Sequence, residues 1–231
     1  MQVVILCGGK GTRLSGYTEE IPKPLVQVGD KPILHHLMEM YAHFGYTNFI
    51  LCLGYKGQKI EEYFKNKNEK KWGIEFSYTG ENANKAERLM KVKQKVNDIF
   101  LLSYGDDLSD VNINEVIKFH NAQKKIVTLT AVPLISPFGI IELNLQNEVV
   151  SFKEKPKLSY LMNGGFYVVN KKIFDFIKEG DELEKEVFET LAKKKQIAAF
   201  KHNGFWKSMN TLKDVVELNE MHSKGITPWI K

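Results

Sequence analysis

The chain has 231 residues, which suits one large domain. Its hydrophobic fraction of 43% and charged fraction of 26% are ordinary for a globular protein, and no stretch approaches the roughly 18 apolar residues of a membrane span. The short N-terminal apolar run follows no basic region and predicts a buried strand in a cytoplasmic protein. A net charge of +5 suits small polyanions, whereas no zinc-finger spacing or dense basic stripe favours nucleic acid.

Short apolar runs alternate with amphipathic stretches through the first half of the chain. In chain order we predict strand 3–6, helix 31–44, strand 48–53, helix 56–66, strand 74–78, helix 85–96, strand 99–103, helix 112–123 and strand 127–132. This alternation is typical of β-α-β units on a mostly parallel sheet flanked by helices, a Rossmann-like α/β fold.

The second half of the chain carries more strands and fewer helices. Here we predict strands 139–143, 149–152 and 165–169, followed by helices 182–194 and 211–222. The economical interpretation is a single domain, residues 1–231, with a main core over 1–132 and a smaller lobe over 133–231. Ligands of such sheets bind beyond the carboxyl ends of the strands, where the loops after residues 6, 103 and 152 fall.

The loop after the first strand is rich in glycine and reads GGKGTRL over residues 8–14. Glycine permits close backbone approach, so that exposed N–H groups can cradle phosphate oxygens. Arg13 adds a permanently charged fork that suits phosphate. The spacing matches neither a Walker loop nor the dinucleotide fingerprint. About ten residues later, Pro22 and Pro24 hold Lys23 in a stiff segment that can direct one ammonium at a phosphate.

GGKGTRL followed by PKPL resembles the sugar-nucleotide pyrophosphorylases, nucleotidyltransferases of glycosyltransferase-A-like fold. More of the chain is similar to one branch, the glucose-1-phosphate cytidylyltransferases. The stretches that carry this likeness are KPILHHLMEMY, GYKGQKIEEYF, YGDDLSD, FKEKPK, NGGFYVVN, GFWKSMNTLKDV and TPWIK, which run from one end of the chain to the other.

The resemblance implies nucleotidyl transfer. An acceptor phosphate oxygen attacks the α-phosphorus of a nucleoside triphosphate, pyrophosphate leaves, and no catalytic base is needed because the nucleophile is already anionic. Arg13 would neutralise the triphosphate, Lys23 would lie near the α-phosphate, and Asp106 would bind Mg²⁺, which Mn²⁺ could replace. The expected nucleotide contacts are Leu6, Gly8, Gly9, Gly11, Thr12, Arg13, Arg88 and Gly105.

Several of these residues also have a simpler interpretation. Asp106 could be a turn residue after a strand, and Asp107 could assist the metal or be merely solvated. Arg88 falls where the family carries an arginine near the nucleotide, but it could equally be a surface arginine of a helix.

On the acceptor side, the family resemblance points to Glu154, Lys155, Asn163, Gly164 and Trp206. Lys155 precedes Pro156, as Lys23 precedes Pro24, and in the family this lysine lies near the acceptor phosphate. The alternative for Lys155 is a surface charge. Trp206 could form a wall of the acceptor pocket or fill a gap in the core.

The chain departs from the family pattern at two places. Two glycines expected before Arg88 are Ala86 and Glu87, and an aspartate expected as a second metal ligand is Asn210, whose neutral oxygen binds a hard cation more weakly. We therefore expect an altered acceptor whose amine could pair with Glu87. L-glutamine phosphate fits, as in the phosphoglutamine cytidylyltransferases of capsular phosphoramidate biosynthesis, whose product is CDP-L-glutamine. The alternative is neutral drift in an enzyme that makes CDP-glucose.

CTP is the expected triphosphate from the branch likeness, and UTP, GTP and dTTP stay open because the base is read largely by loops. The expected partners are this triphosphate and a phosphorylated small-molecule acceptor, within a homo-oligomer. A catalytically silent regulatory relative is the alternative from another class, and only Asn210 favours it, since Arg13 and Lys23 are both present.

Overall fold

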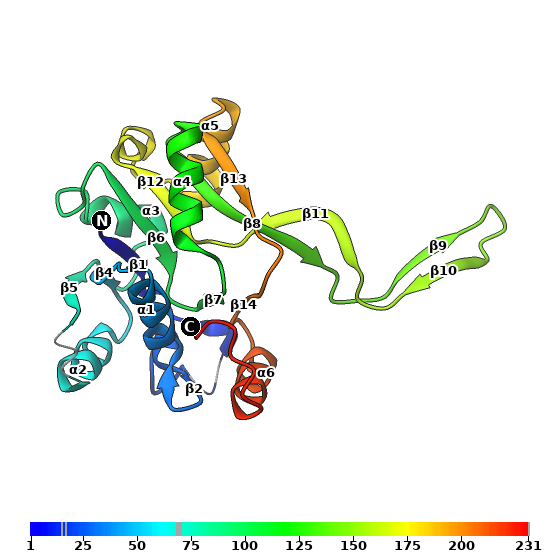
Figure 1. The fold of residues 1–231 in the computed structure, drawn as a ribbon, viewed down its shortest axis with the longest axis horizontal. Coiled ribbons are helices and arrows are strands. Elements are labelled where there is room, and N and C mark those ends of the chain that lie inside the picture. Colours follow the sequence, from blue (N-terminus) through cyan, green and yellow to red (C-terminus); the bar gives the residue numbers. More distant parts are fainter. Residues whose placement is uncertain (15, 17, 68–70, 231) are drawn as a thin grey trace.

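The computed structural model describes residues 1–14, 16, 18–67 and 71–230, with the side chain of Arg13 excepted. Its centre is a sheet in the order β11-β8-β12-β6-β1-β4-β5, with β13 paired to the outer side of β8 (Figure 1). The parallel half consists of β1 (Val3–Leu6), β4 (Asn48–Leu53), β5 (Gly73–Tyr78) and β6 (Ile99–Tyr104). This confirms the predicted mixed, mostly parallel α/β fold.

The second half of the sheet is mixed. Strand β12 (Tyr167–Asn170) runs antiparallel to both β6 and β8 (Val127–Ile135). Beyond it, β11 (Lys157–Asn163) pairs antiparallel with β8, and β13 (Ile197–Lys201) pairs parallel with it. The antiparallel β12 therefore joins the parallel strands to the later part of the chain, so both halves share one continuous sheet.

Two apolar layers cover the two faces of the sheet, because successive strand residues point to opposite sides. Val3 and Ile5 face a layer that includes α1 (Ile33–His43), α2 (Gly57–Lys67), α4 (Ile113–Gln123) and α6 (Leu212–Ser223). Val4 and Leu6 face α3 (Lys85–Lys91), two irregular helical segments η3 (Lys171–Phe176) and η4 (Leu183–Phe188), and α5 (Glu189–Lys193). The buried first strand expected from the sequence is thus the centre of the core.

Some predicted elements have different bounds in the structure. The helix expected over 85–96 ends at Lys91, because the chain turns through Val92 to Lys95 before it enters β6. The helix expected over 182–194 is divided into η4, a single wide π-type segment, and the short α5. No helix in the described ranges is both long and apolar enough to span a bilayer.

The small elements place the loops of the site. Two short helical turns, η1 (Thr12–Leu14) and η2 (Lys23–Leu25), follow β1, and the two-residue strands β2 (Gln27–Val28) and β3 (Lys31–Pro32) pair before α1. Strand β7 (Asp107–Ser109) pairs antiparallel with β14 (Trp206–Ser208).

The strands β9 (Ile140–Leu143) and β10 (Val149–Lys153) form a hairpin that projects from the body (Figure 1). The two strands were predicted. Among the described strands the hairpin pairs only with itself, and it stands away from the sheet.

Candidate active site

A cavity of about 610 Å³ lies where the glycine loop, the end of β6 and the start of α3 meet, a volume in the range of small-molecule sites. It is at the carboxyl ends of the parallel strands, as expected for an open α/β sheet. The lining residues from the first part of the chain include Leu6, Gly8, Gly9, Gly11, Thr12, Lys23, Arg88, Gly105, Asp106 and Asp107. Those from the second part include Asn163, Glu182, Glu184, Trp206, Ser208 and Asn210.

The strand order explains why distant segments meet at this cavity. Strand β1 pairs with β6, and the Gly105 N–H donates to the Leu6 carbonyl at 3.2 Å, which places the Gly105–Asp106 turn beside the glycine loop. The β7–β14 ladder aligns Ser208 with Asp107, and the Met209 N–H donates to the Asp106 carbonyl at 2.9 Å. Asn210 therefore follows at the same corner.

Lys23, Asp106 and Asn210 form the polar centre of the cavity. The Lys23 ammonium forms an ion pair with the Asp106 carboxylate and donates to Asn210 Oδ1 at 3.0 Å. The Lys23 and Asp106 side chains are only 11% and 21% exposed, so this charge pair is partly shielded from water. Three residues separated by up to 187 positions thus converge on one point, as the sequence predicted for Lys23 and Asp106.

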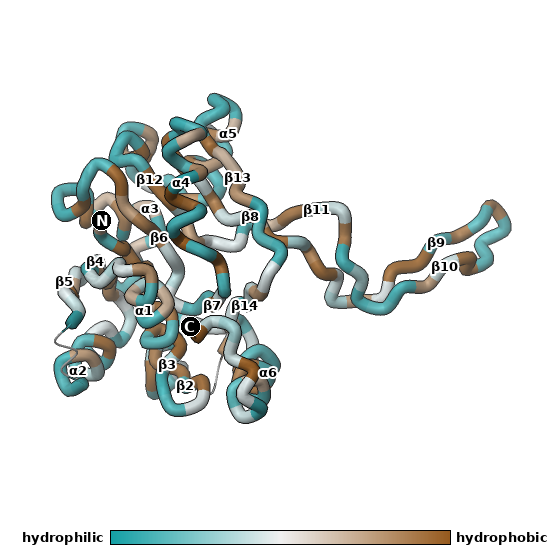
Figure 2. The backbone as a smooth tube through the Cα atoms, in the orientation of Figure 1, coloured by the Kyte–Doolittle hydropathy of each residue, from teal (hydrophilic) through white to brown (hydrophobic). Residues whose placement is uncertain are grey.

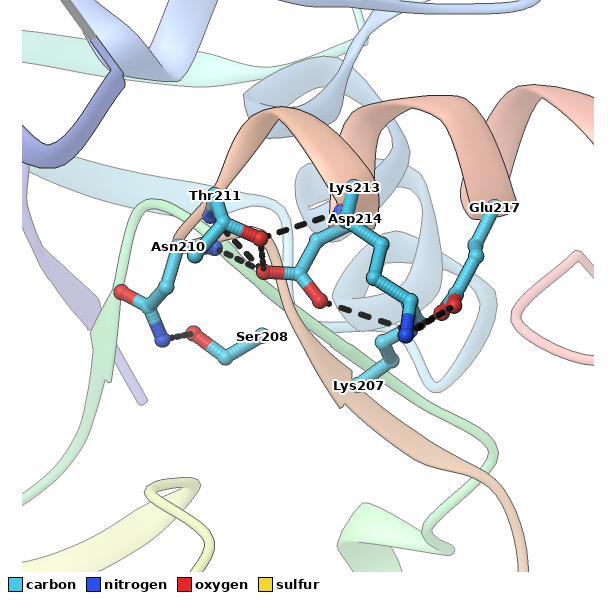
Figure 3. Close-up of polar contacts among 7 residues, drawn as sticks. All are labelled: Lys207, Ser208, Asn210, Thr211, Lys213, Asp214 and Glu217. Carbon is cyan, nitrogen blue, oxygen red and sulfur yellow. Dashed lines mark hydrogen bonds and ion pairs between the residues drawn. The ribbon is translucent and has the colours of Figure 1, made fainter. Parts of the chain in front are cut away.

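The N-terminus of α6 fixes Asn210. The Asp214 carboxylate accepts the backbone N–H groups of Asn210 at 3.0 Å and Thr211 at 2.8 Å (Figure 3). The Asn210 amide donates to Ser208 Oγ at 2.8 Å, so its oxygen is left to face Lys23 (Figure 3). A capping box therefore positions the residue that replaces the family's aspartate.

Asp107 belongs to the same cavity and is buried. Burial, and after it the negative charge of Asp106, raises the pKa of the Asp107 carboxyl well above its usual value. The alternative that Asp107 is merely solvated is wrong.

Arg88 is inside the protein, 4% exposed, so the alternative of a surface arginine is wrong. Its guanidinium donates to the Gly8 carbonyl at 2.9 Å, the Gly80 carbonyl at 2.8 Å and Thr79 Oγ1 at 2.7 Å. Longer bonds reach the carbonyls of Leu53 and Glu81. Burial lowers the pKa of Arg88 from its usual value. Arg88 thus supports the glycine loop from the protein interior, through its hydrogen bond to the Gly8 carbonyl.

Two glycines of the loop have a geometric reason to be glycine. A Cβ on Gly8 would lie 2.0 Å from an Arg88 guanidinium nitrogen. Gly11 has a φ of +63°, and a Cβ there would lie 3.1 Å from the Lys23 Cβ. The backbone of Arg13 belongs to the helical turn η1. Its side chain lies outside the described part of the structure.

The acceptor-side predictions divide into two groups. Trp206 lines the cavity, its Nε1 donates to the Gly164 carbonyl at 2.7 Å, and its ring also packs against the apolar core. Asn163 also lines the cavity and donates to the Tyr167 hydroxyl at 2.6 Å. Glu154 and Lys155 are not among the cavity-lining residues. Both are exposed at the base of the projecting hairpin, where Lys155 Nζ lies 3.6 Å from Glu154 Oε1.

Glu87 is engaged elsewhere. Its carboxylate accepts the Asn84 N–H at 2.9 Å, and its own N–H donates to the Asn84 side chain at 2.9 Å. The two residues form a capping box at the start of α3. Glu87 is not among the cavity-lining residues, whereas its neighbours Lys85 and Arg88 are. The structure therefore explains Glu87 by helix capping.

Sequence reasoning missed a polar network on the wall opposite Lys23. Glu184 accepts from the Tyr104 hydroxyl at 2.6 Å and forms an ion pair with Lys85. The Tyr104 hydroxyl also lies 2.8 Å from that of Tyr167. Burial raises the pKa of Tyr104 well above its usual value, so it stays a neutral donor. No local motif marks Glu184, because its partners are 80 or more residues away.

Among the described residues, no group of three or more histidine, cysteine, aspartate and glutamate side chains could hold a metal ion. Two oxygens, from Asp106 and Asn210, nevertheless converge on one cation, the Lys23 ammonium. Such a sparse donor set fits Mg²⁺, which is commonly held by one or two carboxylates together with substrate phosphates and water.

Comparison with known proteins agrees with this geometry. The model of the nucleotidyl transferase family matches residues 2–225. The glucose-1-phosphate cytidylyltransferases of Salmonella typhimurium and Salmonella typhi are each 40% identical, over 99% of this chain and 98% of theirs. The chain therefore belongs to the nucleotidyl transferase family and is a nucleotidyltransferase. Within that family its likeness is to the glucose-1-phosphate cytidylyltransferase branch.

Solved structures show the same fold. HddC from Yersinia pseudotuberculosis superposes with a TM-score of 0.76 at 24% identity, covering 96% of this chain and 99% of that one. A UDP-glucose pyrophosphorylase complexed with UDP-glucose gives 0.76 at 18% identity, covering 97% and 98%.

Proposed function

We propose that this chain transfers the CMP group of CTP to the phosphate of glucose 1-phosphate and releases pyrophosphate. The observation that carries the proposal is the Lys23 ammonium, held between Asp106 and Asn210 beside the glycine loop. A cation held there can neutralise the charge shared by the α-phosphate and the attacking acceptor phosphate. The relatives named for this reaction support both the nucleotide and the acceptor.

The two halves of the cavity take different parts of the reaction in this proposal. The loop from Gly8 to Gly11 holds the triphosphate by its backbone, with Arg13 and the Arg88-supported turn beside it. Asn163 and Trp206 contact the sugar of the acceptor, since both line the wall contributed by the second half of the chain. This placement supports the proposed division into a mainly nucleotide-binding part, residues 1–132, and a mainly acceptor-binding part, residues 133–231.

A divalent cation is the proposed cofactor. Asp106 would be its carboxylate ligand and Asn210 its neutral ligand, with the buried Asp107 carboxyl in the same cavity. When bound, Mg²⁺ supplies Lewis-acid charge neutralisation of the phosphates. Lys23 would direct its ammonium at the substrate phosphates beside that cation.

The expectation of L-glutamine phosphate as acceptor rested on Glu87 and Asn210, and the first of these two supports is lost. The comparisons favour glucose 1-phosphate, the alternative acceptor. The Glu87 carboxylate, which suggested an amine-bearing acceptor, caps α3.

The test is a matrix of pyrophosphate-release assays. CTP, UTP, GTP and dTTP are each combined with glucose 1-phosphate or L-glutamine phosphate, with Mg²⁺ and with a chelator. The proposal predicts release from CTP with glucose 1-phosphate that stops when metal is removed. A clear preference for another triphosphate or for L-glutamine phosphate would overturn the proposed substrates. A Lys23→Met variant controls for contaminating activity.

A further inference from the structure

A second cavity, of about 670 Å³, lies at the amino end of β6, whereas the catalytic cavity lies at its carboxyl end. The lining of the second cavity includes Ile99, the first residue of β6, and Asn170, the last residue of β12, which pair with each other. The residues that follow α4 and α5 complete it, and Figure 2 shows hydrophilic stretches around both helices. The described lining residues of the two cavities do not overlap. We call the second one the lysine cavity.

Positive charge is concentrated on the walls of the lysine cavity. Lys124, Lys125, Lys172 and Lys194 line it, against one acidic residue, Asp175. This lining has a net charge of +3, in a chain whose net charge is +5. The catalytic cavity is different, because its described lining has three cationic and four acidic residues. The excess of positive charge, which suits small polyanions, is therefore not explained by the catalytic cavity.

The four lysines are available to a ligand. In the described ranges none of them has an ion-pair partner, and the Lys194 ammonium lies 5.9 Å from the centre of the Phe176 ring, which also lines the cavity. They come from separate segments, since Lys124 follows α4, Lys172 belongs to η3 and Lys194 follows α5. Cations that gather without anionic partners repel one another, so a bound anion stabilises this arrangement.

His120 adds a buried polar side chain to the wall. It is 3% exposed, and its Nδ1 lies 2.9 Å from Thr128 Oγ1 in β8. Among the described residues Nε2 has no hydrogen-bond partner, so the second ring nitrogen is left for a ligand. A buried, fixed imidazole together with an aromatic ring distinguishes the lysine cavity from an ordinary lysine-rich surface.

Lysines at the ends of helices also have a simpler explanation, because cations stabilise the negative carboxyl end of a helix dipole. This accounts for Lys124 and Lys194, which follow α4 and α5 directly. It does not account for Lys172, which lies near the start of η3, or for the convergence of all four lysines on one cavity. Lys193 offers the discriminating comparison, since it ends α5 but is not among the cavity-lining residues.

We propose that the lysine cavity binds an oligophosphate, a pyrophosphate group that is either free or carried by a nucleotide. One phosphate monoester has a charge of about −1.5 to −2 near pH 7, so a lining of net charge +3 matches two linked phosphates better than one. The lysine ammoniums pair with the phosphate oxygens, and His120 fixes the ligand from the buried side. The site is separate from the catalytic cavity and depends on neither the proposed substrates nor a metal.

The first test locates the ligand by the reactivity of individual lysines. The full chain is treated with a limiting acetylating reagent, without metal, in the presence of pyrophosphate, CTP or glucose 1-phosphate, and each lysine is quantified by mass spectrometry. Pyrophosphate should slow the acetylation of Lys124, Lys125, Lys172 and Lys194 and leave Lys193 unchanged. Equal protection of Lys193, or no protection of the lining lysines, overturns the proposal.

The same experiment distinguishes the sources of the ligand. Protection by CTP at lower concentration than by pyrophosphate assigns the site to nucleotides, and the reverse order assigns it to free pyrophosphate. Glucose 1-phosphate has one phosphate and should protect more weakly than either. If glucose 1-phosphate protects the lining lysines best, the assignment to an oligophosphate is wrong.

The second test measures affinity with a matched pair of double variants. Lys172→Glu/Lys194→Glu reverses two charges of the cavity, and Lys178→Glu/Lys193→Glu reverses two exposed neighbours outside it, with the same change in net charge. The pyrophosphate concentration that half-protects Lys125 gives the Kd of this cavity alone. The first double variant should raise that Kd about tenfold or more, because two favourable charge pairs become unfavourable, and the control should leave it unchanged.

An equal rise in both double variants would show a general effect of net charge and overturn the site. Circular dichroism checks that each variant is folded. Lys172→Gln/Lys194→Gln removes the two charges without reversing them and serves if the reversed variant does not fold. It should raise the Kd in the same direction, and an unchanged Kd in this variant also overturns the proposal.

Discussion

Gly8→Ala tests the idea that Arg88 supports the glycine loop. A Cβ at residue 8 would lie 2.0 Å from one guanidinium nitrogen and 2.2 Å from the central carbon. Arg88 must then move, although it is 4% exposed and donates to the carbonyls of Gly8 and Gly80 and to Thr79. Displacing a buried, hydrogen-bonded cation costs about 3–5 kcal/mol.

For a chain of this length, a loss of about 3 kcal/mol lowers the melting temperature by about 10 °C. Gly9→Ala is the matched control, because a Cβ there has no neighbour within 4 Å and the residue needs no positive φ. Thermal unfolding followed by circular dichroism should separate the two variants clearly. Gly9→Ala should keep the wild-type melting temperature yet weaken CTP binding, since Gly9 lines the cavity.

A double-mutant cycle with Arg88→Ala sharpens the result. If Arg88 is the group displaced, the two changes are far from additive, because either one alone already breaks the same contacts. A Gly8→Ala protein that melts within about 2 °C of the wild type would refute the support role of Arg88.

Three further predictions follow from the site and the core. Lys23→Ala should lower kcat by orders of magnitude while the melting temperature changes little, because the Asp106 carboxylate left behind faces the open cavity; near-normal turnover removes Lys23 from the mechanism. Trp206→Phe should raise KM for the acceptor more than for CTP, as it removes the bond to Gly164; equal effects on both KM values contradict its place on the acceptor wall. Burial raises the pKa of Glu39, but hydrogen bonds from His35 and Lys31 outweigh this and lower it to about 2. The stabilising effect of the Glu39 carboxylate is present above the unfolded pKa near 4.5 and is lost as the pH falls toward 2. Glu39→Gln should therefore have a lower melting temperature than the wild type at pH 7 and the same melting temperature near pH 2. An equal difference at both pH values would contradict that linkage.

The nucleotide side of the site could be predicted from the sequence because its signals are local. The glycine loop follows a buried strand, Lys23 lies between two prolines, and Asp106 follows the apolar run of β6. The alternation of strands and helices places the glycine loop and Asp106 at the same edge of a parallel sheet. The structure brings Lys23 and Asp106 into direct contact there.

The rest of the site could not be predicted in this way, because it depends on contacts between segments that are distant in the sequence. Nothing near Arg88 in the sequence shows that its side chain turns inward to the Gly8 carbonyl, 80 residues away. Glu184 belongs to an irregular helical segment, and it reaches the cavity only because η4 packs beside α3. Glu87 illustrates the reverse error. A departure from a family pattern suggested a new ligand contact, while the simpler local explanation, a capping box with Asn84, accounts for it.

The measurement that tests the central claim most directly uses CTP with one radioactive phosphorus atom and follows where that atom goes. With the radioactive phosphorus at the α position, the enzyme, Mg²⁺ and glucose 1-phosphate should give a labelled sugar nucleotide and unlabelled pyrophosphate. With the label at the γ position, all of it should appear in pyrophosphate. Transfer of the γ label to the sugar, or no labelled sugar nucleotide from α-labelled CTP, would contradict nucleotidyl transfer to this acceptor.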